Sequence, residues 1–541
     1  MIKVFSVAEM VAAEKAADGA GVSYDAMMEN AGQALADAIL ERYPVRGATV
    51  TVLVGPGNNG GDGLVAGRYL AEAGADVGFY LYRPRDPQSD ANYAQLQEMG
   101  LTVLTAADDQ RYRVLRTRLK ISDVVIDALL GTGVDRPIEG ELANLMRQAA
   151  AGLDERRSIL AKQAASKLIS VAQVAGDGDV GEWPTARPVV VAVDCPSGLN
   201  TDSGALDPLT IAADLTVTFA GPKQGHFKFP GATACGELVV ADIGISHDLP
   251  EVQAVDLELI TAARAGQLRP DRPLNGHKGS FGWVLVGAGA SRYWGAPALA
   301  GRGAYRVGAG LVALAVPESI RGALATQLPE ATYPLVKDID VLSATTAEAL
   351  LADMGTYEAL LVGPGLHHAA AFIETLFPVG ARSDLPPTVV DADGLNLLSE
   401  LPDWPGRLPP KCLLTPHPGE MARLMGIDVS EVLKQDRIDV ARSQAAAWNC
   451  VVLLKGAFTV VAAPDGRAGL LPFANPALAT AGSGDVLSGI LVGLLAQGMA
   501  VYEAALLGAY LHGAAAGLAG VNAGLLAGEI ADWVPEVLAV L

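Results

Sequence analysis

Cysteine is scarce in this sequence. Its 541 residues include only Cys195, Cys235, Cys412 and Cys450, which form no CxxC pair and have no metal-ligand spacing. This scarcity excludes a disulfide-rich scaffold and a structural zinc site built on cysteine. We therefore expect four reduced thiols, most of them buried.

Aromatic and charged residues are also few, at 5% and 18%, whereas half of the residues are hydrophobic and glycine (61) outnumbers proline (32). This composition is typical of a compact α/β protein and excludes a disordered or collagen-like chain. At about 100–200 residues per domain, the length predicts two or three domains.

Positive charge is in deficit, since 39 Lys and Arg face 60 Asp and Glu for a net charge of −21. The average field of such a protein repels nucleic acid, which we exclude as a partner. Small anionic ligands remain open, because backbone N–H groups at helix N-termini bind phosphate without net positive charge.

One long run, residues 504–528, has no charged side chain. It contains His512, Asn522 and several glycines, and no Lys or Arg follows Arg467. A membrane span usually has a cationic flank, so we expect buried helices here and no membrane partner.

The N-terminal segment lacks the apolar core of a signal peptide, which predicts a cytoplasmic protein.

Strand-like runs alternate with helical patterns along both halves of the chain. This alternation predicts parallel βαβ units: a Rossmann-like, doubly wound domain over residues 1–245, a linker over 246–264 and a second α/β domain over 265–541. Residues 148–187 break the alternation, and we expect a surface insertion there.

The first candidate site begins at the glycine-rich loop 55–63, which follows a strand and leads into a helix. Glycines let the backbone approach a phosphate, yet the next strand ends in Tyr-Leu-Tyr-Arg at 80–83, without the acidic residue that holds a ribose. The glycines alone fit a phosphate loop and a simple turn equally well. Two further strands end in Asp127 and Asp194, which either converge in one crevice or cap helices.

The three segments GPGNNGGDG (55–63), DALLGTG (127–133) and DCPSGL (194–199) together resemble the NAD(P)H-hydrate (NAD(P)HX) epimerases. The resemblance implies that Asn59, Asp127 and Ser197 hold K⁺, and that Asp194 contacts the substrate; we expect Asp194 to be the acid–base residue. It also implies a set of substrate-binding residues: Asn58, Asn59, Gly60, Gly61, Asp62, Gly131, Thr132, Gly133, Val134, Asp135, Arg136, Pro137 and Asp194. This chain departs from the family in the long 148–187 bridge and in Cys195, where Ile is common.

A carboxylate suits the chemistry of an epimerase. Interconversion of the R and S hydrates at nicotinamide C6 requires proton movement and an iminium-type intermediate, which negative charge stabilises.

The second candidate site is the segment TAGSGDVLSG at residues 480–489. Small residues at a helix N-terminus form an anion hole, and Asp485 is placed to accept a proton from a hydroxyl that attacks phosphorus. The alternative is a glycine-rich helix start with Asp485 as a cap.

With further motifs upstream, residues 265–541 resemble the ADP-dependent NAD(P)H-hydrate dehydratases, which have a ribokinase-like fold. These motifs are HKG (277–279), GAGLV (308–312), VGPG (362–365), DADGLN (391–396), TPHPGE (415–420) and KGAFT (455–459). The resemblance implies that the nucleotide is bound by Lys455, Gly456, Ala457, Phe458, Thr459 and Gly484. It also implies that Ala296, Gly365, His417 and Asp485 face the hydrate, although residues 291–297 depart from the family's run of small residues, and His417 alone also fits a structural loop histidine.

Phosphoryl transfer explains how such an enzyme removes water, because phosphate leaves C6 more easily than hydroxide does. Asp485 takes the hydroxyl proton, the amides of 481–484 stabilise the phosphoryl group, and elimination restores the ring. We expect Mg²⁺ on the diphosphate, held through water by Glu420 and Asp391.

The two resemblances thus imply a bifunctional repair enzyme that epimerises NAD(P)H hydrate and dehydrates its S form, converting ADP to AMP and phosphate. We also expect a homo-oligomer. Two alternatives remain. One is a ribokinase-like small-molecule kinase with an appended dinucleotide-binding regulatory domain, and the other is a dinucleotide-sensing scaffold without activity.

Overall fold

The computed structural model describes residues 1–167 and 188–541. The chain divides into an N-terminal unit, Lys3–Val255, and a C-terminal unit, Asp256–Leu541, with which Met1 and Ile2 group. The division falls inside the passage 246–264 that we expected to be a linker. This passage carries helix α7 (Pro250–Gln253) and strand β9 (Leu257–Leu259), because its apolar residues are buried in the cores on either side.

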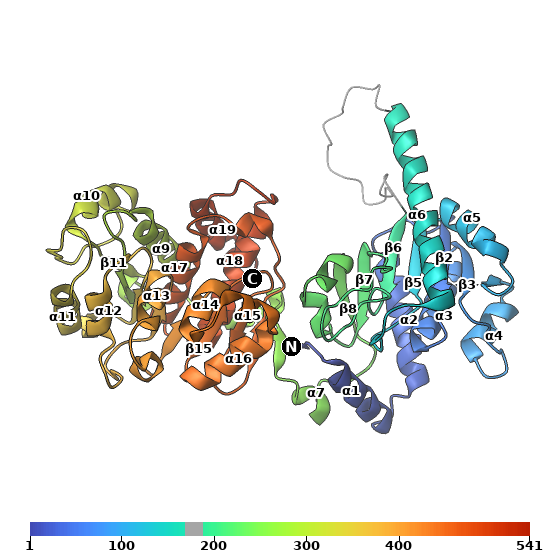
Figure 1. Cartoon of the computed structure of the whole chain (residues 1–541), viewed down its shortest axis with the longest axis horizontal. Helices are drawn as coiled ribbons and strands as arrows, with labels where there is room; N and C mark the ends of the chain where they lie inside the picture. Colours follow the sequence, from blue (N-terminus) through green and yellow to red (C-terminus); the bar gives the residue numbers. More distant parts are fainter. Residues whose placement is uncertain (168–187) are drawn as a thin grey trace. The chain divides into compact units, whose positions relative to one another are not determined.

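The N-terminal unit has a seven-stranded parallel sheet in the order β4-β3-β2-β5-β6-β7-β8 (Figure 1). Its strands are β2 (Thr49–Val54), β3 (Asp76–Leu81), β4 (Thr102–Thr105), β5 (Val124–Ala128), β6 (Val189–Val193), β7 (Leu215–Phe219) and β8 (Glu237–Ala241). Its other helices are α1 (Val7–Gly19), α2 (Tyr24–Leu40), α3 (Asn58–Glu72), α4 (Ala91–Glu98), α5 (Arg113–Ile121) and α6 (Gly140–Lys167). This is the strand order of a doubly wound sheet, which confirms the predicted Rossmann-like class.

Alternating side chains of the strands fill two cores, one on each face of this sheet. Val52 of β2 lies in the core that helices α2 and α3 cover, whereas Leu53 lies in the core beneath α5 and α6. Strands buried on both faces are nearly continuous in hydrophobic residues, as the VVVAV sequence of β6 is.

The register of the strands brings their carboxyl ends to one edge. Val54 of β2 pairs with Ala128 of β5, and Asp127 pairs with Ala192 of β6. The loops that follow β2, β5 and β6 therefore meet where the strand order reverses, between β2 and β5, which is the position of ligand sites in such sheets.

The expected insertion, residues 148–187, begins as a continuation of a helix. Helix α6 runs to Lys167 and extends away from the rest of its unit (Figure 1). Residues 168–187 of the expected insertion lie outside the described residues.

The C-terminal unit has a ten-stranded mixed sheet in the order β1-β9-β17-β16-β15-β14-β13-β12-β10-β11. Its strands are β1 (Ile2–Lys3), β9, β10 (Trp283–Gly287), β11 (Leu311–Ala315), β12 (Ala359–Val362), β13 (Thr388–Val390), β14 (Cys412–Leu414), β15 (Val451–Leu454), β16 (Val460–Ala462) and β17 (Ala468–Leu470). From β11 to β15 neighbouring strands are parallel, and β16 is antiparallel to both of its neighbours. The sheet confirms the α/β class of this half.

Helices enclose this sheet. They are α8 (Ala262–Leu268), α9 (Gly295–Arg306), α10 (Glu318–Gln327), α11 (Ala344–Ala352), α12 (Ala370–Leu376), α13 (Asp393–Ser399), α14 (Pro418–Met425), α15 (Val429–Lys434), α16 (Arg437–Trp448), α17 (Ser483–Ala496), α18 (Val501–Leu518) and α19 (Ala527–Val540). Helices α9 and α17 pack closely because Gly489 has no side chain. A Cβ atom at this position would lie 2.0 Å from the carbonyl oxygen of Ala300.

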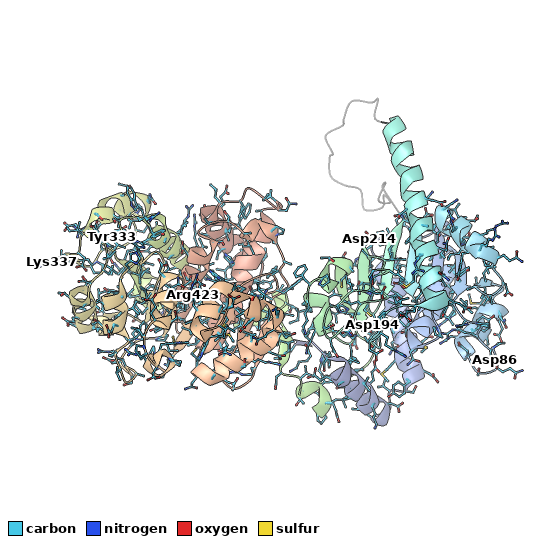
Figure 2. The ribbon with its side chains drawn as sticks, in the orientation of Figure 1. Asp86, Asp194, Asp214, Tyr333, Lys337 and Arg423 are labelled. Atoms are coloured by element: carbon cyan, nitrogen blue, oxygen red, sulfur yellow. The ribbon has the colours of Figure 1, made fainter. Side chains whose placement is uncertain are left out.

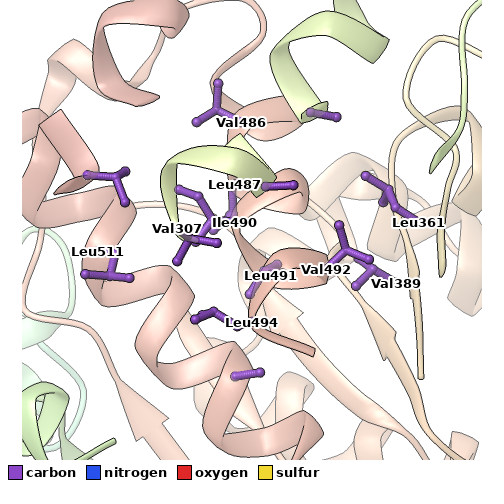
Figure 3. Packing of buried hydrophobic residues seen from close by; sticks show 14 of the residues in the cluster. Val307, Leu361, Val389, Val486, Leu487, Ile490, Leu491, Val492, Leu494 and Leu511 are labelled. Atoms are coloured by element: carbon purple, nitrogen blue, oxygen red, sulfur yellow. The ribbon is translucent and has the colours of Figure 1, made fainter. Parts of the chain in front are cut away.

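The core of the C-terminal unit is aliphatic. Ile490 and Leu491 of α17, together with Val389 of the sheet, lie in one buried cluster (Figure 3). The uncharged run 504–528 belongs largely to α18, which is buried in the same core. Of the helices in the described part of the chain, none combines the length and hydropathy that crossing a membrane requires. All four cysteines are free and buried, as expected.

Candidate active sites

The glycine loop of the N-terminal unit is held tightly by its neighbours. A Cβ at Gly55 would lie 1.8 Å from the carbonyl oxygen of Leu129, so the loops after β2 and β5 touch only because Gly55 lacks a side chain. Arg85 donates hydrogen bonds to the carbonyl oxygens of Gly55 (2.8 Å) and Gly57 (2.9 Å). Helix α3 begins directly after Gly57 with no side-chain cap, which leaves backbone N–H groups for an anion.

Beside this loop lies a cavity of about 1120 Å³. Of the substrate-binding residues expected from the sequence, the cavity is lined by Asn58, Asn59, Asp62, Gly131, Thr132, Gly133, Val134, Asp135, Arg136, Pro137 and Asp194. Gly60 and Gly61 do not line it, since their backbones pack against the side chains of Arg85 and Met28.

The residues expected to hold K⁺ form a compact group that hydrogen bonds hold together. The buried carboxylate of Asp127 accepts hydrogen bonds from Ser197 Oγ (2.6 Å) and Ser197 N (2.9 Å). Asn59 Nδ2 donates to the carbonyl oxygen of Leu130 (3.0 Å), whose N–H donates to Ser197 Oγ (2.9 Å). Burial raises the pKa of Asp127, and the hydrogen bonds from Ser197 partly oppose this shift.

Asp194 occupies the carboxyl end of β6, at the opposite end of the sheet from Asp214 (Figure 2). Its backbone has a positive φ of 61°, which a non-glycine residue rarely adopts. Its Oδ1 accepts hydrogen bonds from Thr218 Oγ1 (2.9 Å), Phe219 N (3.1 Å) and Lys223 Nζ (2.5 Å). Asp194 therefore does not cap a helix.

Lys223 is the main residue of this site that the sequence analysis missed. Its side chain is 1% exposed, and Nζ also donates to Thr218 Oγ1 and to the carbonyl oxygen of Phe219, both at 3.1 Å. Burial acts to raise the pKa of Asp194, but the ammonium group of Lys223, together with His226 and the N–H group of Phe219, outweighs it and holds the pKa below its usual range. Lys223 follows β7 at the same sheet edge, so the rule that singled out Asp127 and Asp194 was sufficient to find it.

Two more carboxyl groups line this cavity. Burial raises the pKa of Asp62 well above its usual range, and the charges of Asp194 and Glu14 act in the same direction. Glu14, from α1, also has a raised pKa because of its burial. No motif marks Glu14, which lies in the middle of α1.

In the C-terminal unit, three buried charged side chains form a network. Lys455 Nζ lies 2.7 Å from Asp391 Oδ1 and 3.5 Å from Glu420 Oε2. Burial acts to lower the pKa of Lys455, but the two carboxylates outweigh it and raise the pKa. Asp391 and Lys455 directly follow β13 and β15, and Glu420 lies in the first turn of α14, the helix that follows β14, the strand between these two.

Asp485 lies next to this network, in the first turn of α17. A Cβ at Gly484 would lie 3.6 Å from Lys455 Nζ and 4.0 Å from Asp391 Oδ2, which places the helix start against the charged group. The helix has no side-chain cap, so its N–H groups are available for an anion. Burial raises the pKa of Asp485 to about 7; the charge of Asp391 adds to the shift and that of Lys455 opposes it.

The loop 455–459 follows β15 and is fixed by Arg437. This guanidinium donates to the carbonyl oxygens of Leu454 (3.1 Å), Lys455 (3.0 Å) and Ala457 (2.9 Å). Thr459 Oγ1 donates to the carbonyl oxygen of Gly456 (2.9 Å) across the same turn.

The other residues expected to face the hydrate lie in two places. A Cβ at Gly365 would approach the Cβ atoms of Ala296 (3.2 Å) and Tyr293 (2.8 Å), so the loops after β10 and β12 adjoin. His417 caps α14 through Nδ1, which accepts from the N–H groups of Gly419 and Glu420, yet half of its side chain stays exposed.

Comparisons with known proteins match both halves. Residues 284–536 match the family described as NAD(P)H-hydrate dehydratase, and residues 24–225 match the family described as YjeF-related protein N-terminus.

Several relatives match nearly the whole chain. The bifunctional NAD(P)H-hydrate repair enzyme Nnr of Moorella thermoacetica is 39% identical over 95% of this chain and 92% of its own length. The enzyme of the same name from Thermofilum pendens is 34% identical over 100% and 97%. Among solved structures, the ADP/ATP-dependent NAD(P)H-hydrate dehydratase from Bacillus subtilis, co-crystallized with ATP/Mg²⁺, is 34% identical, covers 53% of this chain and 99% of its own, and has a TM-score of 0.46.

Proposed function

Because this chain belongs to the family of bifunctional NAD(P)H-hydrate repair enzymes, we propose a division of labour in which each unit carries one of its two activities. The protein is an NAD(P)H-hydrate epimerase and an NAD(P)H-hydrate dehydratase. The observation that carries the proposal is that each expected catalytic carboxylate, Asp194 or Asp485, lies beside a buried lysine in a different unit.

The N-terminal unit interconverts the R and S hydrates. The dinucleotide lies in the cavity beside 55–63 and 131–137, with a phosphate at the uncapped start of α3. Asp194 faces the nicotinamide ring, where its negative charge stabilises the iminium-type intermediate.

A potassium ion fits the group of Asn59, Asp127 and Ser197. These residues supply a carboxylate, a hydroxyl and an amide oxygen beside the carbonyl oxygen of Leu130, and oxygen atoms are the ligands that hard cations prefer. When bound, the ion supplies positive charge that offsets buried Asp127. The side chains themselves fix the loops after β5 and β6 around the substrate.

The C-terminal unit removes water from the S hydrate with ADP as co-substrate. Asp485 accepts the proton of the C6 hydroxyl, whose oxygen attacks the terminal phosphorus of ADP, so that AMP leaves. The backbone amides of 481–484 hold the transferring phosphoryl group. Loss of phosphate from C6 and of a proton from C5 then restores the dihydropyridine ring.

The nucleotide lies against 455–459 and Gly484, and the hydrate lies against Ala296, Gly365, His417 and Asp485. Mg²⁺ fits the acidic pair of Asp391 and Glu420, which hold it through water; when bound, it neutralises charge on the diphosphate. Lys455 lies between the two carboxylates and orients both.

The test uses the full chain, mixed R and S hydrates of NADH, and ADP. We expect NADH and orthophosphate to form together until both epimers are consumed. A stable phosphorylated acceptor would instead identify a small-molecule kinase, and binding without turnover would identify a sensing scaffold.

Two expectations about the cellular form belong to this proposal. Four buried free cysteines support a reducing compartment such as the cytoplasm. Light scattering on the purified chain tests the expected homo-oligomer.

A further inference from the structure

The cavity of the N-terminal unit brings together ionisable side chains from four elements. Glu14 comes from α1, Asp62 from α3, Asp194 from the end of β6 and Lys223 from the loop after β7. Three carboxyl groups thus face one ammonium group in a site where Asp62 is 9% exposed and the Lys223 side chain is 1% exposed. Low exposure makes unpaired charge costly, so such a cluster holds at least one carboxyl group neutral.

The two oxygen atoms of Asp194 have different surroundings. Oδ1 accepts three hydrogen bonds, from Thr218, Phe219 and Lys223. From the residues that the structure describes, Oδ2 receives none, although Asp194 lines the cavity. One oxygen is therefore fixed by the protein and the other is left for a ligand.

We propose that Asp62 is the proton donor of the epimerisation, that Asp194 accepts the returning proton at Oδ2, and that Lys223 is the residue that positions Asp194. This inference deepens the epimerase function proposed for the cavity and rests on it. It assigns separate tasks to two carboxyl groups that share one site, as acid and base pairs in enzymes commonly do.

Epimerisation begins at the C6 hydroxyl group of the hydrate. Asp62 gives its proton to the C6 hydroxyl, the C6–O bond breaks, and water leaves with the electron pair. The lone pair of the ring nitrogen N1 forms the N1=C6 bond of the iminium ion. Water then adds to the opposite face of C6, the π electrons return to N1, and the proton of the added water passes to Asp194 Oδ2. Exchange of protons with solvent in the open cavity restores both carboxyl groups.

The charged neighbours favour Asp62 as the acid. Burial raises its pKa well above the usual range, with Asp194 and Glu14 adding to the shift and Lys223 and Arg85 opposing it. Arg85 is engaged elsewhere, because it pairs with Asp90 at 2.5 Å and holds the glycine loop.

The remaining neighbours leave Asp194 as the ionised partner. Lys223 keeps the pKa of Asp194 low against its burial. Burial lowers the pKa of His226 to about 4, and the charge of Lys223 acts in the same direction, so this histidine is neutral near pH 7. Glu14 is less enclosed than Asp62 and has the smaller shift in pKa.

The first experiment measures R-to-S exchange of NADH hydrate by the full chain, without ADP, above the uncatalysed rate. We expect Asp62→Asn to slow exchange by at least about 10²-fold, the lower range for loss of a general acid, and Asp62→Glu to retain more activity than Asp62→Asn. Asp108→Asn, the same change at an exposed carboxyl group of this unit, is the matched control and should exchange at the wild-type rate. Exchange by Asp62→Asn within about threefold of the wild type, or equal losses in both Asp62 variants, would overturn the proposal.

The second experiment tests the positioning role of Lys223 through the pH profile. Exchange should rise with pH as Asp194 ionises and fall as Asp62 ionises. Lys223→Met removes the charge that lowers the pKa of Asp194, so the acidic limb should move to higher pH, whereas Lys223→Arg should keep it near the wild-type position. A lower rate with an unmoved acidic limb would contradict the role of Lys223. Wild-type protein that exchanges no epimers would overturn the epimerase function itself, which separates the two failures.

Discussion

The ammonium nitrogen of Lys455 lies 2.7 Å from Oδ1 of Asp391, and both side chains are nearly removed from water, with exposures of 17% and 2%. This pair joins the end of β15 to the end of β13, across β14. It holds the nucleotide loop, the acidic pair expected to bind Mg²⁺ and the first turn of α17 in one place. The charge of the C-terminal site is thus arranged before any ligand binds.

Removal of this buried cation should destabilise the C-terminal unit. Lys455→Met leaves Asp391 and Glu420 buried without their partner, and we expect the free energy of unfolding to fall by about 3–5 kcal/mol in a urea titration. Arg467→Met is the control, because Arg467 pairs with Asp465 at 2.9 Å but is 53% exposed, and its loss should cost at most about 1 kcal/mol. Equal losses in the two variants would show that the Lys455 network does not support the fold.

Asp485→Asn should separate catalysis from stability. The change keeps the shape of the side chain but removes the base, so phosphate release from ADP with the S hydrate should fall by at least about 10²-fold. R-to-S exchange on the same preparation should not change, because Asp194 lies in the other unit.

The same variant should melt no earlier than the wild type. Folding raises the pKa of Asp485 from 3.8 to about 7, so this carboxyl group weakens the folded state progressively as pH rises between these values. Asparagine removes that cost. A large drop in the melting temperature at pH 7 would mean that lost activity reflects misfolding.

Dehydration should depend on pH through Asp485. A base with a pKa of about 7 is mostly protonated below that pH, so the rate should rise through about pH 7. The charge of Asp393 contributes to the shift, and its Oδ2 accepts from the N–H group of His367 at 2.9 Å. Asp393→Asn keeps an oxygen there but removes the charge, and it should move the midpoint to lower pH; an unmoved midpoint would assign the titration to another group.

Potassium should stabilise the N-terminal unit by binding. We expect KCl, but not choline chloride, to raise the melting temperature and the exchange rate of the wild type, since an ion that binds only the folded state stabilises it. Asp127→Ala removes one of the proposed ligands, and both responses to potassium should disappear. If Asp127→Ala still responds like the wild type, the cation binds elsewhere.

A fragment of residues 256–541 should fold without the rest of the chain, because its core is complete apart from the edge strand that begins at Ile2. It should dehydrate the S hydrate and leave the R hydrate unchanged. Rapid consumption of both epimers by the soluble fragment would contradict the proposed division of labour.

The sequence predicted those parts of the two sites that consist of strand ends followed by glycine-rich loops. Asp127, Asp194 and the 55–63 loop converge because parallel strands in register end at the same edge, a consequence of alternation alone. Lys223 follows β7 at that edge and could have been found by the same rule, although no motif surrounds it. Glu14 lies within helix α1, where no strand end marks it, and the importance of both residues comes from burial near another charge. The structured passage at 246–264 was also missed, because Pro250 and its polar residues resemble those of a linker.

The clamp that Arg437 forms on the carbonyl oxygens of Leu454, Lys455 and Ala457 has a thermodynamic consequence. A loop that is ordered during folding has already lost its conformational entropy, so a nucleotide that binds there does not have to supply that free energy. Shortening Arg437 would therefore transfer the cost of ordering from folding to binding. Calorimetry would register this transfer as a less favourable entropy of nucleotide association, even though Arg437 is bonded to backbone carbonyl groups and need not touch the nucleotide.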